Sequence, residues 1–151
     1  MGGLVSARYC DVMHNMNFDH LAKEYSYALD MTDHNASNLE VNRVLKKAAC
    51  NFPSDSPEKL AWFTAALKNP EQKWFVARLM AKINPVPKSL LDDLVLAAMT
   101  EPNPSANKHY IIPCVKTFGK AFVMEVMLKY VSNPEAIECN GFEKTAYWLG
   151  S

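Results

Sequence analysis

Cysteine and histidine side chains near the N-terminus are the first candidates for chemistry, because thiolate sulfur and imidazole nitrogen bind transition metals. Cys10 and His14 would be one helical turn apart, His20 follows, and His34 is the nearest further ligand type. No Cys-x-x-Cys pair occurs in the 151 residues, and these spacings match no conventional zinc site. We therefore expect incidental polar residues here, with no metal and no other cofactor.

Two further groups could take part in catalysis: His109 with Cys114, and the adjacent carboxylates Asp92 and Asp93. Five residues of helix place His109 and Cys114 on different faces, and a nucleophile also needs a base within hydrogen-bond reach. Adjacent helical residues diverge by about 100°, so Asp92 and Asp93 do not converge on one proton or metal ion. The chain has no glycine-rich phosphate loop and no hydrolase motif. The sequence predicts a protein that is not an enzyme, with no catalytic residues.

Lysines are unevenly distributed along the chain. Residues 102–124 contain Lys108, His109, Lys116 and Lys120 but no Asp or Glu. Such a segment could contact phosphates, which leaves nucleic acid open as a partner. A set of about six to ten phosphate contacts would need more basic residues, and the whole chain balances 16 basic against 16 acidic residues. Our default interpretation of this segment is solvent-exposed lysines.

The composition is that of one folded domain. Hydrophobic residues make up 49% of the chain and charged residues 21%, which excludes a disordered chain. No apolar run approaches the roughly 20 residues of a membrane-spanning helix. The four cysteines follow no disulfide-rich pattern, so we expect reduced thiols in the cytoplasm.

Apolar residues recur at steps of three and four along most of the chain, which predicts short amphipathic helices in an all-α fold. Phe75, Val76, Leu79 and Met80, for example, form one apolar stripe. The pattern predicts about eight helices, over residues 17–30, 37–49, 57–68, 70–83, 88–100, 105–118, 120–132 and 134–149, the last interrupted at Asn140-Gly141.

Four helix starts are predicted by a capping residue followed by proline. The Ser or Asn side chain can accept a hydrogen bond from the first turn, and proline at the first helical position loses no hydrogen bond. These dipeptides are Ser56-Pro57, Asn69-Pro70, Asn103-Pro104 and Asn133-Pro134. Gly119 is expected to separate two helices. Pro113 lies inside a predicted helix and should kink it.

Pairs of predicted helices recur along the chain, at an interval of 34 residues from Pro70 to Pro104 and of 30 residues from Pro104 to Pro134. Repeated pairs of this length indicate an α-solenoid, in which neighbouring units cover one another's apolar faces. A compact helical bundle is the alternative. The expected pairs are 70–83 with 88–100 and 105–118 with 120–132.

The segment from Asn69 to Ile83, with its Asn-Pro opening, apolar stripe and Arg78, resembles the first helix of a HEAT-type repeat, and the helix that contains Pro113 resembles the next one. The resemblance covers about residues 57–149. It implies a right-handed α-α superhelix of HEAT-like helix pairs. It also implies a non-enzymatic binding scaffold, or adaptor, that recognises a macromolecular partner on its concave face, although fold-level analogy does not fix a site.

In this prediction residues 1–16 are an N-terminal tail and residues 17–149 a single HEAT-like helical-repeat domain. The implied concave face consists of helices 88–100 and 120–132. The positions expected to contact a protein partner are Asp92, Asp93, Lys120 and Met124, with Lys73 and Trp74 beside Arg78 as a further aromatic and cationic patch.

Two alternatives stay open. A few HEAT-like proteins, the DNA glycosylases that remove alkylated purines, bind DNA on a basic surface. The alternative function is therefore nucleic-acid binding, or alkylpurine-type DNA glycosylase activity, through Lys108, Lys116 and Lys120. The first residues also match the N-myristoylation pattern, with Gly2 as acceptor and Ser6 at the expected position, which would make the protein a lipid-anchored adaptor. We expect an ordinary N-terminus instead.

Overall fold

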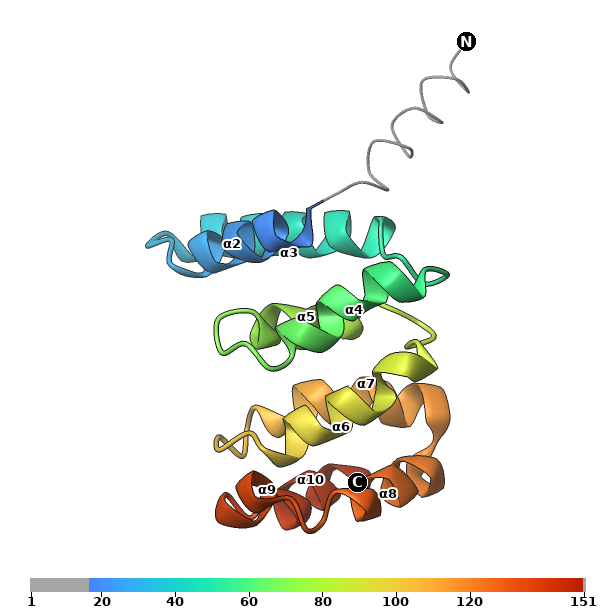
Figure 1. Ribbon diagram of the computed structural model, residues 1–151. Helices are drawn as coiled ribbons and strands as arrows, with labels where there is room; N and C mark the ends of the chain where they lie inside the picture. The colour runs from blue at the N-terminus through green and yellow to red at the C-terminus, as the bar shows by residue number, and fades with distance from the viewer. Residues whose placement is uncertain (1–16, 151) are drawn as a thin grey trace.

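The computed structural model describes residues 17–150, which form helices and no β-strand (Figure 1). The prediction of an all-α fold is confirmed. The helices are α2 (Phe18–Leu29), α3 (His34–Cys50), α4 (Pro57–Ala66), α5 (Lys73–Met80), the 3-10 turn η1 (Lys88–Leu90), α6 (Leu91–Met99), α7 (Asn107–Phe118), α8 (Lys120–Lys129), α9 (Pro134–Glu138) and α10 (Gly141–Gly150). The predicted tail over residues 1–16, with Gly2, Cys10 and His14, lies outside the described residues.

The helices are stacked in layers along one direction (Figure 1). α2 packs against α3, α4 lies beside α5, α6 packs against α7, and α8, α9 and α10 form the last layer. Between layers, α3 contacts α5, α5 contacts α7, α7 contacts α10, and α6 contacts α8. This stack is compatible with the expected solenoid.

The helix pairs that pack together in the structure differ from the predicted pairs by one helix along the chain. We expected residues 70–83 to pair with 88–100, but α6 packs against α7, and α5 lies in the layer of α4. The connector over residues 81–87 runs from one layer to the next (Figure 1). An apolar stripe indicates that a helix is buried but not which neighbour covers it, so sequence spacing alone could not make this choice.

Two of the predicted helix starts are confirmed. At the start of α4, Ser56 Oγ accepts a hydrogen bond from the Lys59 N–H at 3.4 Å. At the start of α9, Asn133 Oδ1 accepts hydrogen bonds from the N–H groups of Glu135 at 3.0 Å and Ala136 at 3.1 Å. Proline is the first residue of both helices, where its missing N–H costs no hydrogen bond.

Asn69 and Asn103 behave differently from this expectation. Their side chains accept hydrogen bonds from the N–H groups two residues later, of Glu71 at 2.8 Å and Ser105 at 2.9 Å. Asparagine closes such local turns readily. α5 and α7 begin only after these turns, so the predicted positions of both helix starts were wrong by about one turn.

The predicted breaks between helices are confirmed. Gly119, with φ +86°, separates α7 from α8, and Asn140, with φ +58°, separates α9 from α10. Glycine and asparagine are the residues that adopt this left-handed conformation most readily. Pro113 lies inside α7, which continues on both sides of it.

One hydrophobic cluster runs through all the layers. Its fully buried side chains include Phe63, Phe75, Leu79 and Tyr110. Trp62, Trp74 and Trp148 are partly buried and pack against this cluster. Within residues 17–150, no helix combines the length and the apolar character needed to cross a membrane.

α10 approaches the end of α6 closely at Gly141. A Cβ atom at this position would lie 1.6 Å from the carbonyl oxygen of Met99. Next to it, the Cys139 thiol donates a hydrogen bond to the same oxygen at 3.1 Å. Only glycine allows this contact, which holds α10 against α6.

Candidate functional site

A cleft of about 390 Å³ lies between the C-terminal end of α5, the connector that follows it, and one side of α7. We call it the basic cleft. It is lined by Met80, Ala81, Ile83, Asn84, Lys108, His109, Ile112, Pro113, Lys116 and Thr117. The cleft therefore collects Lys108, His109 and Lys116 from the basic segment singled out in the sequence.

α7 positions the two lysines at separate points along the cleft. Lys108, Ile112 and Lys116 follow one another at steps of four residues, so they stay on one side of the helix. Ile112, which is partly exposed, is midway between the two lysines along the helix. Lys120 is exposed on α8 and does not line the cleft.

The basic cleft carries positive charge that its own lining does not neutralise. None of its lining residues is Asp or Glu. Within residues 17–150, neither Lys108 nor Lys116 forms an ion pair. The pKa of His109 is below its usual value because the imidazole is partly buried and because Arg78 and Lys108 are nearby. The fixed charge of the cleft thus comes from its lysines, and the imidazole favours its neutral form.

Aromatic rings contact two of the residues that line the cleft. The Trp74 ring meets the His109 ring edge-on at 4.8 Å, and the Arg78 guanidinium is 6.0 Å from the Trp74 ring centre. The Lys108 ammonium is 5.5 Å from the Trp148 ring centre. These distances are in the range of cation–π interaction. Trp74 is partly buried against the core and contacts His109, so it does not form an open aromatic patch.

Asp92 is engaged in contacts between α6 and the end of α8. Its Oδ2 accepts a hydrogen bond from the Tyr130 hydroxyl at 2.6 Å and lies 3.1 Å from the Lys129 ammonium. The hydroxyl, followed by the ammonium, holds the pKa of Asp92 below its usual value. The same hydrogen bond raises the pKa of Tyr130 to about 12. Asp92 therefore has intramolecular partners that tie two layers together.

Asp93 and Met124 also have contacts within the protein, whereas Lys120 forms no ion pair within residues 17–150. Asp93 accepts a hydrogen bond from the Thr64 hydroxyl at 3.1 Å, which joins α6 to α4. Met124, which we expected to be exposed, is partly buried and packs against the core. Apolar side chains one position off a helical stripe can still reach a neighbouring helix, which explains the difference.

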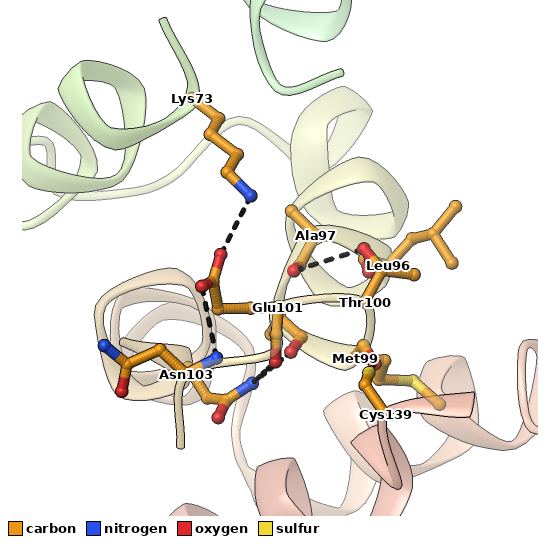
Figure 2. A network of polar contacts seen from close by, with 10 residues as sticks. Lys73, Leu96, Ala97, Met99, Thr100, Glu101, Asn103 and Cys139 are labelled. Carbon is orange, nitrogen blue, oxygen red and sulfur yellow. Dashed lines mark hydrogen bonds and ion pairs between the residues drawn. The ribbon is translucent and has the colours of Figure 1, made fainter. Parts of the chain in front are cut away.

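Lys73 belongs to a polar network at the end of α6 (Figure 2). Its ammonium forms an ion pair with Glu101 at 2.9 Å, and the second oxygen of Glu101 accepts from the Asn103 N–H at 3.3 Å. The buried Asn107 amide donates to the carbonyl oxygens of Ala98 and Glu101. These hydrogen bonds join the first residue of α7 to the end of α6 and the turn that follows it. Asn107 was not singled out in the sequence, where nothing distinguishes it from other loop asparagines.

A second cleft, of about 480 Å³, lies beside this network. Its charged lining residues are Lys68, Lys73, Asp93 and Glu135. Both signs of charge are present, and Lys73 and Asp93 already have the partners described above. This cleft has no net charge that would select a ligand.

The structure gives no support to nucleophilic or metal chemistry in the part of the chain that it describes. Cys114 is fully buried, and burial raises the pKa of its thiol to about 12, so it is not a reactive thiolate. Among residues 17–150, no three His, Cys, Asp or Glu side chains are grouped as metal ligands would be. Comparison of the sequence and structure with family models, curated proteins and solved structures finds no match.

Proposed function

We propose that the protein is a non-enzymatic helical-repeat scaffold of HEAT-like type, acting in the cytoplasm, that binds an anionic region of a macromolecular partner in the basic cleft. The observation that carries this proposal is the grouping of Lys108, His109 and Lys116 around one cleft without an acidic lining residue. Uncompensated charge in a concave site attracts ligands of opposite charge and raises their local concentration.

The α6 and α8 face is a weaker candidate than the basic cleft. Asp92 and Asp93 have hydrogen-bond partners inside the protein, so a partner would compete with those contacts. Lys108 and Lys116 have no such ion pairs within residues 17–150. A protein partner with acidic side chains would therefore gain new ion pairs at the cleft without breaking existing ones.

The test is a binding titration with poly-glutamate as an acidic probe. The variant with Lys108→Glu and Lys116→Glu reverses the charge of the cleft. The matched control, with Lys23→Glu and Lys46→Glu, makes the same change of net charge on α2 and α3. We expect about a tenfold or greater loss of affinity in the cleft variant only, since two exposed ion pairs contribute about 1 kcal/mol or somewhat more together. Equal losses in both variants would contradict the proposal.

Nucleic-acid binding is the second candidate function, favoured by the same uncompensated lysines. It differs in its predicted response to salt, because each phosphate contact adds to the salt dependence of the binding constant. A gel shift of duplex DNA that weakens steeply with salt, and that the cleft variant abolishes, would support it. For a base-excision activity, the basic cleft supplies no carboxylate from its lining residues to assist cleavage of a glycosidic bond.

A further inference from the structure

We propose that the basic cleft binds an extended acidic segment of a partner protein, with two acidic residues four positions apart and an apolar residue midway between them. This inference rests on the proposed function and adds the identity and spacing of the ligand. It is carried by the order of side chains along α7, where Lys108, Ile112 and Lys116 line the cleft one after another.

The spacing of the two lysines sets the spacing of the acidic residues. Lys108 and Lys116 are eight residues apart on α7, so a rise of about 1.5 Å per residue separates them by about 12 Å along the helix axis. An extended peptide rises about 3.3 Å per residue, which places residues i and i+4 about 13 Å apart. These two residues also point to the same side, whereas residues i and i+3 point to opposite sides. Positions i and i+4 therefore match the lysines.

The middle of the cleft fits an apolar side chain. Ile112 of α7 and Ile83 of the connector are the partly exposed isoleucines of its lining, and Ile112 is midway between the two lysines along α7. Residue i+2 of an extended peptide points to the same side as residues i and i+4. A side chain of the size of leucine at i+2 would be removed from water against these residues, which adds affinity and fixes the register.

The walls of the cleft are held in place before any ligand binds. The Val86 N–H donates a hydrogen bond to Thr117 Oγ1 at 3.0 Å, which ties the connector after α5 to α7. The Trp148 ring lies beside the Lys108 ammonium and restricts its position. A site that is already ordered loses less conformational entropy on binding.

A nucleic-acid strand matches this arrangement less well than a peptide. A duplex carries one phosphate charge per about 3.4 Å of axis on each strand, so a strand that spans both lysines would also place phosphates over the apolar side chain of Ile112. Removing such charges from water against an apolar surface is unfavourable. The alternation of cation, apolar surface and cation favours the peptide.

The experiment is a fluorescence anisotropy titration of the full chain with labelled peptides that carry neutral Gly-Ser ends. The first peptide has the core Glu-Ala-Leu-Ala-Glu, and the second has the same composition in the order Glu-Ala-Leu-Glu-Ala. We expect the first to bind about tenfold more tightly. Replacing its leucine by serine should weaken binding several-fold, a change that cannot affect the folding of the protein.

Protein variants locate the binding site. Lys108→Gln with Lys116→Gln should lower the affinity for the first peptide about tenfold or more, while Lys23→Gln with Lys46→Gln should leave it unchanged. Circular dichroism and thermal unfolding establish that both variants are folded. Equal losses in the two variants would overturn the assignment of the ligand to the basic cleft.

The remaining outcomes separate failure of the inference from failure of the proposed function. Equal affinity for the two peptides, with retained dependence on Lys108 and Lys116, overturns the spacing and leaves the cleft as an acidic-partner site. A short DNA duplex that binds more tightly than the first peptide and displaces it overturns the peptide in favour of nucleic acid. Absence of binding to both peptides, to poly-glutamate and to DNA overturns the proposed function itself.

Discussion

Replacing Gly141 by alanine tests the contact that holds α10 in the stack. The added Cβ atom would lie 1.6 Å from the Met99 carbonyl oxygen, 2.5 Å from its carbonyl carbon and 2.9 Å from its Cα atom. All three are backbone atoms of α6, so no side-chain rotation relieves the overlap. α10 must therefore move away from α6. Because α10 carries Trp148, whose ring lies beside Lys108, the same movement would disturb one end of the basic cleft.

The size of the effect follows from the distance that α10 must move. An ordinary contact of about 3.4 Å would require a displacement of nearly 2 Å, which separates apolar side chains that pack at about 3.5–4.0 Å in a close-packed core. Overpacking of a core costs about 1–3 kcal/mol, and a backbone overlap lies at the upper end of that range. We expect Gly141→Ala to lower the free energy of unfolding by about 3 kcal/mol. For a chain of this length the midpoint of thermal unfolding would fall by about 6–12 °C.

The assay is urea unfolding followed by circular dichroism, with Gly150→Ala as the control. Gly150 is the last residue of the same helix, and a Cβ atom there would have no neighbour within 4 Å. The control should change the free energy of unfolding by less than about 0.5 kcal/mol. If Gly141→Ala is as stable as the control, α10 does not approach α6 as described, and the reasoning is refuted.

Three further perturbations test other parts of the structure. Tyr130→Phe removes the hydroxyl that donates to Asp92 and should cost about 1 kcal/mol near neutral pH. The pKa of Asp92 is lowered in the folded protein, so the stabilisation from this hydrogen bond is present above the usual pKa of an aspartate and is lost as acid protonates the carboxylate. If Tyr130→Phe lowered the free energy of unfolding by the same amount at about pH 2, this reasoning would be contradicted. The pKa of His109 is lowered in the folded protein, so the unfolded chain binds a proton at this imidazole more readily than the folded chain does. The free energy of unfolding should therefore fall as the pH drops below about 6.5. In the His109→Gln variant the midpoint of urea unfolding should depend less on pH below this value. A thiol reagent should label exposed Cys50 in the native protein and buried Cys114 only after unfolding, and mass mapping that finds Cys114 labelled in the native state would disprove its burial.

The helical segments could be predicted from the sequence because their causes are local. An apolar stripe at steps of three and four, a capping side chain and a left-handed residue act within a few neighbours of the chain. Gly119 and Asn140 were recognisable for this reason. Asn69 and Asn103 were misjudged because the same side chain can cap a helix or close a turn, and the choice depends on packing of the following residues.

The candidate site was recognisable only in part. The lack of acidic residues around Lys108 and Lys116 is visible in the sequence, but the cleft needs the end of α5 as its second wall. Asp92 and Asp93 are equally conspicuous charges, and their partners Tyr130 and Thr64 come from other layers. A sequence shows that a charge exists, whereas only the folded chain shows what neutralises it.

The sequence by itself determined that this chain is helical, where most of its helices lie and which side of each is apolar, since these properties depend on residues within one or two turns. The tertiary structure decided which helices share a layer, which charges already have partners and where a cleft remains. Those features depend on contacts between residues that are far apart along the chain, and many arrangements of the same amphipathic helices would bury the same apolar stripes.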